Sequence, residues 1–210
     1  MKTDTNLIIE YLDELLPDVG CELFYSKDYE LLIAVMLSAQ TTDKAVNKVT
    51  NVLFNKYPNL ESLSNASIEE LESCIKAIGL YKNKAKNIKA IAFELMQSHG
   101  GKVPHSREQL SRLPGVGHKT AGVVLAELFN DPEFPVDTHV ARISKRLNLA
   151  SNDDTPIEIE NKLKKAFPKD KWIRLHHQFI HFGRYYCFAK SPNCKNCKLL
   201  AICKEKTRKN

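Results

Sequence analysis

The chain has 210 residues, of which 43% are hydrophobic and 27% charged, with a formal net charge of +6. This balance is typical of a globular protein with a buried core, and a chain of this length folds into one or two compact units without disulfides. The longest apolar run, residues 31–37, is far short of the ~18 residues that span a bilayer, and the acidic, helix-patterned amino terminus is unlike a secretory signal. Membrane and secretory classes are therefore excluded, and we expect a cytoplasmic protein.

Every segment with a clear hydrophobic pattern predicts a helix, and none has the alternating pattern of a strand. Near the amino end, apolar residues at helical spacing predict one helix from Leu7 until Pro17 and a second from Asp28 to about Leu37. A third helix carries Val46 and Val49 and ends before Pro58. The first part of the chain is therefore expected to be entirely helical.

Three helix starts are marked by a hydroxyl side chain followed three residues later by Glu or Gln, the pattern of a capping box. These pairs are Ser67 with Glu70, Ser106 with Gln109, and Thr155 with Glu158. Glycines are expected to end three helices: Gly79, Gly100 and Gly183. Together these signals predict an all-α protein of about ten helices.

The segment 113–121, LPGVGHKTA, predicts a tight turn between two helices. Pro114 ends the first helix, Gly115 and Gly117 permit backbone angles that a side chain would forbid, and the second helix begins at about His118. Exposed amides at a helix amino end carry partial positive charge, so this turn can bind a phosphate oxygen without reading a base.

In the segment PVDTHV, Asp137 is placed to cap a helix that runs to about Leu147. Such a cap contributes about 1 kcal/mol and by itself implies no chemistry.

Four of the six cysteines lie near the carboxyl end in a C-x6-C-x2-C-x5-C pattern. Disulfides are improbable in a cytosolic chain, and four neighbouring thiolates repel one another unless a metal neutralises them. The spacing alone favours zinc, because four-cysteine zinc sites are common. The cysteines are Cys187, Cys194, Cys197 and Cys203.

Basic residues gather in two regions. Residues 151–210 contain 14 basic and 6 acidic residues, and a run of lysines without an intervening acid lies upstream. Either run alone is explained by a solvated helix face, whereas two such regions favour a polyanionic partner. The upstream lysines are Lys76, Lys82, Lys84, Lys86 and Lys89.

Five segments in order, residues 31–43, 75–85, 113–121, 135–143 and 187–203, resemble the endonuclease III family of helix-hairpin-helix DNA glycosylases. The resemblance implies two helical lobes with a DNA cleft between them. One lobe would be a central helical-barrel domain of residues 21–131 with the hairpin. The other would combine residues 1–20 with residues 132–210, including the cysteine loop 187–203.

The same resemblance implies a bifunctional DNA glycosylase and AP lyase that removes oxidised pyrimidines. Lys119 would attack the sugar C1′ and form a Schiff base, and Asp137 would stabilise positive charge on the sugar and take the proton of the amine. Since an exposed lysine is almost entirely protonated at pH 7, we expect Lys119 to react only in a closed, water-poor pocket. The alternatives are that Lys119 is one of 24 lysines on solvated faces and that Asp137 is only a cap.

Resemblance also assigns Gln40 and Leu80 to fill the gap left by the extruded nucleotide, one polar and one apolar. Their alternatives are a polar loop residue and a core leucine. The remaining DNA-binding residues would be Gly115, Val116, Gly117, His118, His139 and Lys190.

The family's cysteine spacing reverses the preference for zinc: Cys187, Cys194, Cys197 and Cys203 would hold a 4Fe-4S cluster. The expected partner is double-stranded DNA with damaged bases or abasic sites, bound by a monomer in the bacterial cytoplasm, near the nucleoid.

Two rival functions remain. A related adenine glycosylase that acts on mispairs shares the hairpin and cluster, but it lacks the lysine at position 119 and carries a further domain beyond the position of Asn210. A non-catalytic DNA-binding module with a structural zinc would need neither Lys119 nor Asp137.

Overall fold

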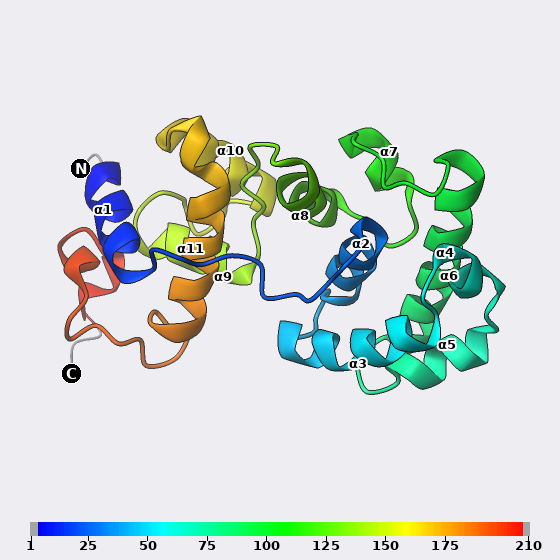
Figure 1. Ribbon diagram of the computed structural model, residues 1–210. Helices are drawn as coiled ribbons and strands as arrows, with labels where there is room; N and C mark the ends of the chain where they lie inside the picture. The colour runs from blue at the N-terminus through cyan, green and yellow to red at the C-terminus, as the bar shows by residue number, and fades with distance from the viewer. Residues whose placement is uncertain (1–3, 208–210) are drawn as a thin grey trace. The chain divides into compact units, whose positions relative to one another are not determined.

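The computed structural model describes residues 4–207, and throughout that range the regular structure is helical, with no strand (Figure 1). The chain forms two compact units, one of Glu22–Asp131 and the other of Met1–Cys21 together with Pro132–Asn210. The division expected from the sequence differs from this one only in placing Cys21 with the central domain. Residues 1–3 and 208–210 lie outside the described part of the chain. No helix among the described residues is long and apolar enough to cross a membrane.

The unit Glu22–Asp131, called the hairpin unit below, is built around α2 (Asp28–Leu37). Nine of the ten residues of α2 are buried, because this helix is apolar on all sides. Helices α3, α6 and α8 contact it. The other helices of the unit are α3 (Asp43–Lys56), α4 (Leu60–Asn65), α5 (Ile68–Ile75), α6 (Tyr81–Ser98), α7 (Arg107–Arg112) and α8 (His118–Phe129).

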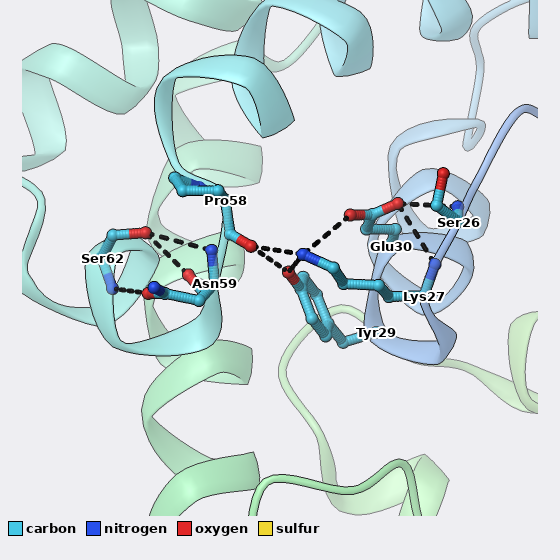
Figure 2. A network of polar contacts seen from close by, with 7 residues as sticks. All are labelled: Ser26, Lys27, Tyr29, Glu30, Pro58, Asn59 and Ser62. Atoms are coloured by element: carbon cyan, nitrogen blue, oxygen red, sulfur yellow. Dashed lines mark hydrogen bonds and ion pairs between the residues drawn. The ribbon is translucent and has the colours of Figure 1, made fainter.

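A polar network fixes the start of α2 against the chain that follows α3 (Figure 2). The Lys27 ammonium and the Tyr29 hydroxyl both donate to the carbonyl oxygen of Pro58, at 2.5 and 3.0 Å. Glu30, whose side chain is almost fully buried, accepts hydrogen bonds from the backbone amides of Ser26 and Lys27. These bonds satisfy a buried carboxylate and hold the central helix in place.

Helix α4 was not predicted from the sequence. It begins at a cap in which the Asn59 side chain accepts from the Ser62 amide at 2.8 Å and the Ser62 hydroxyl lies 3.3 Å from the Asn59 amide. A helix of six residues is too short for a periodic apolar pattern, and its cap pairs Asn with Ser instead of the expected Glu or Gln.

Two of the three predicted capping boxes are confirmed, at Ser67 with Glu70 and at Thr155 with Glu158. At the third, the Ser106 hydroxyl accepts from the Gln109 amide, but the Ser106 amide makes no reciprocal bond to the glutamine side chain.

The predicted glycine stops have mixed outcomes. Helix α6 ends at Ser98, just before Gly100 with its φ of +59°, as expected. The stop at Gly79 is wrong, because α5 already ends at Ile75. The stop at Gly183 is also wrong: this glycine lies inside α11 (Trp172–Tyr185), where a Cβ would approach the Cβ of His139 to 2.9 Å. Gly183 therefore allows α11 to pack closely on α9, and it does not end a helix.

The second unit, called the cysteine unit below, joins the amino-terminal helix to the carboxyl-terminal part of the chain. Ile8 and Leu12 of α1 share one core with Phe134, Leu175 and Phe179. Helix α11 packs against α1 and α9, so the two ends of the sequence form one structure. The described elements are α1 (Thr5–Leu15), α9 (Thr138–Arg146), α10 (Pro156–Ala166), η1 (Lys169–Lys171), α11, η2 (Lys198–Ala201) and η3 (Lys204–Thr207).

Candidate active site

The turn between α7 and α8 depends on one of its two glycines. Gly115 has a φ of +77°, and a Cβ there would lie 2.4 Å from Nδ2 of Asn87 and 3.2 Å from Cγ of Met36. Gly117 has a φ of −90°, and a Cβ there would meet no atom within 4 Å. The prediction that both glycines need forbidden angles is therefore correct for Gly115 and wrong for Gly117. Gly117 is exposed, and no side chain covers the start of α8 at this position.

The other residues of the turn have different surroundings. The Val116 side chain is only 4% exposed, so only its backbone can face a ligand. His118 is exposed and begins α8, and its carbonyl oxygen accepts from the Arg107 guanidinium at 3.0 Å. This bond joins the first turns of α7 and α8.

Lys119 is the second residue of α8, as predicted, and its side chain is partly exposed. Residues 121–126 of the same helix are buried and face the core of the hairpin unit. The burial of α8 therefore fixes the helix and, with it, the position of the Lys119 backbone.

Gln40 and Leu80 both have left-handed backbone angles, with φ of +55° and +58°. A non-glycine residue in this conformation costs about 1–2 kcal/mol and persists only where its surroundings hold it. Gln40 is exposed and Leu80 is 57% exposed. The alternative that Leu80 is a core leucine is therefore wrong.

Asp137 caps α9 as predicted. Its Oδ1 accepts from the Val140 amide at 2.7 Å, and the side chain is partly buried. This cap belongs to the cysteine unit, whereas Lys119 belongs to the hairpin unit.

His139, in the first turn of α9, is half-buried. Burial lowers its pKa most strongly; Asp137 raises the pKa, and Arg142 and Arg184 lower it. Its Nδ1 lies 3.2 Å from Nη2 of Arg142, and its Cβ contacts Gly183 of α11. Packing between two helices therefore orients this ring.

All four cysteines of the carboxyl-terminal cluster line one pocket, together with residues of α9 and η2. Burial raises the pKa of Cys197 and of Cys203, and the neighbouring cysteines raise both further. The Arg146 guanidinium, only 7% exposed, donates to Sγ of Cys187 at 3.2 Å and to the carbonyl oxygen of Phe188 at 2.7 Å. Four thiol sulfurs gathered at one pocket are the donor set that a metal group takes up, so these residues fit such a group.

Two kinds of metal group use four cysteine sulfurs. A single zinc binds them at about 2.3 Å, and in an iron-sulfur cluster each cysteine binds a different iron. The shared pocket of the four cysteines fits either group.

Both basic regions are smaller than the sequence suggests. Lys84 is only 4% exposed, and the Lys89 ammonium donates to the carbonyl oxygen of Ala66 at 2.7 Å, whereas Lys76, Lys82 and Lys86 are exposed. In the cysteine unit several basic residues pair with nearby acids, and Lys190 and Lys195 are exposed. The pairs are Lys162–Asp154, Lys164–Glu133, Lys164–Glu160, Arg174–Asp13 and Lys198–Glu14.

Two buried cations were missed as site residues. Lys84 was grouped with surface lysines because a run of charges does not tell which member turns inward. Arg146 contacts the cysteine loop across 41 residues of sequence, a separation that no local pattern reveals. The apolar neighbours Ala85 and Ile88 are the only sequence signal that Lys84 lies near a buried helix face.

The all-helical fold and the glycine turn are those of a helix-hairpin-helix base excision DNA repair protein. A family model described as "HhH-GPD superfamily base excision DNA repair protein" matches residues 33–169. A solved structure described as "Structure of a thermostable thymine-DNA glycosylase" has a TM-score of 0.82 at 24% identity and covers 96% of this chain and 94% of that one, a likeness of fold.

Closer relatives define the branch. The chain is 46% identical over 197 residues to Endonuclease III of Bacillus subtilis (strain 168), covering 94% of this chain and 90% of the relative. It is 40% identical over 201 residues to Endonuclease III of Escherichia coli (strain K12), covering 96% and 95%. A structure described as "Structure of a Trapped Endonuclease III-DNA Covalent Intermediate: Estranged-Adenine Complex" matches with a TM-score of 0.96 and 46% identity, covering 100% and 99%. The chain belongs to the endonuclease III family, the DNA glycosylases and AP lyases of base excision repair.

Proposed function

We propose that this enzyme removes oxidised pyrimidines from double-stranded DNA and cuts the strand 3′ to the abasic site, with Lys119 as the nucleophile. The observation that carries the proposal is the position of Lys119 in the first turn of α8, directly after the turn that Gly115 requires. The relative whose structure is described as a trapped covalent intermediate with DNA, at 46% identity, supports the same chemistry.

The reaction needs a free amine beside the sugar. The uncharged Nζ of Lys119 forms a bond to C1′ while the bond from C1′ to the base breaks, and the base leaves with a proton. Opening of the sugar ring at O4′ then gives a Schiff base between Lys119 and C1′. Loss of a C2′ proton expels the 3′ phosphate, and water hydrolyses the Schiff base to release the lysine. Exclusion of water around the extruded nucleotide favours the uncharged amine at the start.

Asp137 is the proposed partner of Lys119 in this reaction. Its Oδ1 accepts the cap bond from Val140, which fixes the carboxylate at the start of α9. The negative charge of the carboxylate stabilises the positive charge that develops on the sugar, and it can accept the proton of the amine. The cap and the chemistry are therefore compatible roles.

Gln40 and Leu80 are proposed to occupy the space of the extruded nucleotide. Both side chains are exposed at turns with left-handed backbone, from which they project into solvent. An apolar side chain can replace lost base stacking, and a polar one can bond to the partner base.

Phosphate contacts are assigned to the backbone amides of residues 115–118, to His139 at the start of α9, and to the exposed Lys190. The amides carry the partial positive charge of a helix amino end. Because counterions leave when phosphates are neutralised, binding of a duplex should weaken steeply as salt rises. The enzyme is proposed to act as a monomer in the bacterial cytoplasm, close to the nucleoid, where its DNA substrate lies.

Cys187, Cys194, Cys197 and Cys203 are proposed to hold a 4Fe-4S cluster. Their C-x6-C-x2-C-x5-C spacing and their shared pocket support this assignment. When bound, the cluster crosslinks the loop and supplies a site that can carry an electron. The buried Arg146 positions the loop through its bonds to Cys187 and Phe188.

Borohydride reduction tests the proposal, because it converts a Schiff base into a stable amine. During reaction with a duplex that contains one oxidised pyrimidine, reduction should link the wild-type protein to DNA. Lys119→Gln should abolish the covalent complex and leave duplex binding, and Lys102→Gln, a change at an exposed lysine of the same unit, should leave both. A covalent complex that persists undiminished in Lys119→Gln contradicts the assignment.

A further inference from the structure

Among the lysines of residues 4–205, Lys84 alone is buried, with 4% of its surface exposed. It lies in the first turn of α6, and its ammonium donates to the carbonyl oxygen of Ala39 and to Oγ1 of Thr41, each at 2.9 Å. These two acceptors stand on either side of Gln40. Because the ammonium is directed to these two acceptors, Lys84 is placed to act on the turn around Gln40.

The Lys84 side chain adds two bonds to the turn around Gln40. Within the turn, the Ala39 amide donates to the Met36 carbonyl at 3.5 Å and the Thr41 amide to the Ser38 carbonyl at 3.0 Å, and the Thr41 hydroxyl donates to the Ala39 carbonyl at 3.3 Å. The Lys84 ammonium contacts both ends of the hydroxyl bond. Because Gln40 has a left-handed φ of +55°, which L-residues rarely adopt, this clamp keeps a turn that would otherwise relax.

The same residue also contacts the second exposed turn. The backbone amide of Lys84 donates to the Leu80 carbonyl oxygen at 3.0 Å, the bond with which α6 begins. Leu80 has a left-handed φ of +58°. One residue therefore bonds to both segments, through its main chain at Leu80 and through its side chain around Gln40.

We propose that Lys84 is a positioning residue that links the turns of Gln40 and Leu80, so that the two side chains enter the duplex as one preformed unit. The inference rests on the proposed role of these side chains and adds the residue that sets their spacing. Because both turns are already ordered in the free protein, extrusion of the nucleotide does not have to include the entropic cost of ordering them. Small misplacements of groups that act at such a step slow a reaction strongly.

Lys89 supplies a matched control. It lies on the same helix, and its ammonium also donates to a backbone carbonyl of the hairpin unit, that of Ala66 at 2.7 Å. Lys89→Met removes one lysine-to-carbonyl bond, and Lys84→Met removes one such bond together with the bond to the Thr41 hydroxyl. Both variants keep an unbranched apolar side chain. Both variants are expected to unfold at similar temperatures, and only Lys84→Met loses the link between the turns.

The first measurement is base excision under single-turnover conditions. Lys84→Met should slow excision from a fully paired duplex about 10- to 100-fold, whereas Lys89→Met should match the wild type. When the same damaged base lies in an internal loop of unpaired bases, which needs little separation, the deficit of Lys84→Met should shrink to about 3-fold or less. An equal deficit on both substrates would indicate general structural damage and overturn the proposal.

The second measurement follows the base opposite the lesion. With 2-aminopurine at that position, binding of the wild type and of Lys89→Met should raise its fluorescence as the base unstacks, and Lys84→Met should give a much smaller rise at saturating protein. Thr41→Val removes one acceptor and leaves the lysine, so it tests the same link if Lys84→Met does not fold, with an expected intermediate loss. A full rise in both variants would reject the link.

The outcomes separate the two proposals. If the wild type itself does not excise oxidised pyrimidines, the proposed function fails. If the wild type excises them and Lys84→Met behaves like Lys89→Met, only the positioning role fails.

Discussion

The hairpin unit and the cysteine unit hold their candidate site residues by different means. In the hairpin unit, Gly115 fits against Asn87, and Lys84 bonds around Gln40, so contacts within the protein define the site. In the cysteine unit, four cysteines from one loop line a shared pocket, and the proposed metal group would crosslink that loop. The hairpin unit should therefore be indifferent to the metal, whereas the loop of the cysteine unit should depend on it.

The single tryptophan of the chain allows the two units to be followed separately. Trp172 lies in the cysteine unit, where its indole N–H donates to the Phe167 carbonyl oxygen at 2.9 Å. Its fluorescence reports unfolding of that unit, whereas circular dichroism reports the helices of both.

The largest effect is expected from Cys197→Ser, which removes a thiolate from the centre of the loop. Purified wild-type protein should contain about four iron atoms per chain, and the variant should lose nearly all of them. Because metal binding is coupled to folding of its loop, the transition followed by Trp172 should move to lower temperature. Cys74→Ser, a change in the hairpin unit, should alter neither iron content nor that transition.

One stoichiometric zinc per chain in protein prepared without oxygen would contradict the cluster assignment. An unchanged Trp172 transition in metal-free protein would contradict the dependence of the cysteine unit on its metal.

The next effect is expected at Asp137, where charge and cap can be separated. Asp137→Asn keeps a good capping side chain and removes the negative charge. Excision should slow about 100- to 1000-fold, as for loss of one group that stabilises transition-state charge, while the free energy of unfolding changes by less than about 0.5 kcal/mol. Single-turnover kinetics and urea unfolding measure the two quantities.

Asp4→Asn is the matched control for this variant, because Asp4 caps α1 of the same unit in the same way. It should leave excision unchanged. Excision by Asp137→Asn at the wild-type rate would show that Asp137 is only a cap.

Gly115→Ala tests the packing of the hairpin unit. The left-handed φ and the 2.4 Å approach to Asn87 should together destabilise the hairpin unit by about 2–4 kcal/mol. Circular dichroism should record this loss while the Trp172 transition stays in place. Gly117→Ala, with ordinary φ and open space, should change the free energy of unfolding by less than about 0.5 kcal/mol. Equal losses in the two variants would refute the packing argument.

The smallest effect concerns acid, and it should be similar in the two units. The Ser67 amide lowers the pKa of Glu70, and the Thr155 amide lowers the pKa of Glu158. Each bond stabilises its helix start above the unfolded carboxyl pKa of about 4.3 and is lost as pH falls through the lower folded pKa. In Glu70→Gln, the melting temperature followed by circular dichroism should fall less steeply as the pH is lowered. In Glu158→Gln, the same should hold for the melting temperature followed by Trp172. An unchanged pH dependence in both variants would show that protonation of these caps is not coupled to folding.

Local signals in the sequence were sufficient for much of the fold. Ser67, Thr155 and Asp137 start helices where their side chains predict, because a cap is a contact between residues three apart. The prediction that Gly183 ends a helix is wrong. A glycine is needed at this position because His139 of another helix lies close to it. Lys84 was misread as a surface charge for the same reason, since its partners are 43 and 45 residues away.

The candidate site follows the same division. The sequence placed Lys119 after a glycine turn and Asp137 at a cap, since both positions are local. It could not show that Gly115 is required by a neighbour and Gly117 is not, because only folding brings Asn87 and Met36 to the turn.

The most direct test of the account is to locate the covalent bond. Borohydride-reduced complexes of the wild-type protein with an oxidised-pyrimidine duplex should be digested with nuclease and protease and examined by mass spectrometry. The sugar remnant is predicted on the peptide that contains Lys119. A remnant on Lys84 or another lysine, or efficient strand cutting with no remnant on any lysine, would contradict the account.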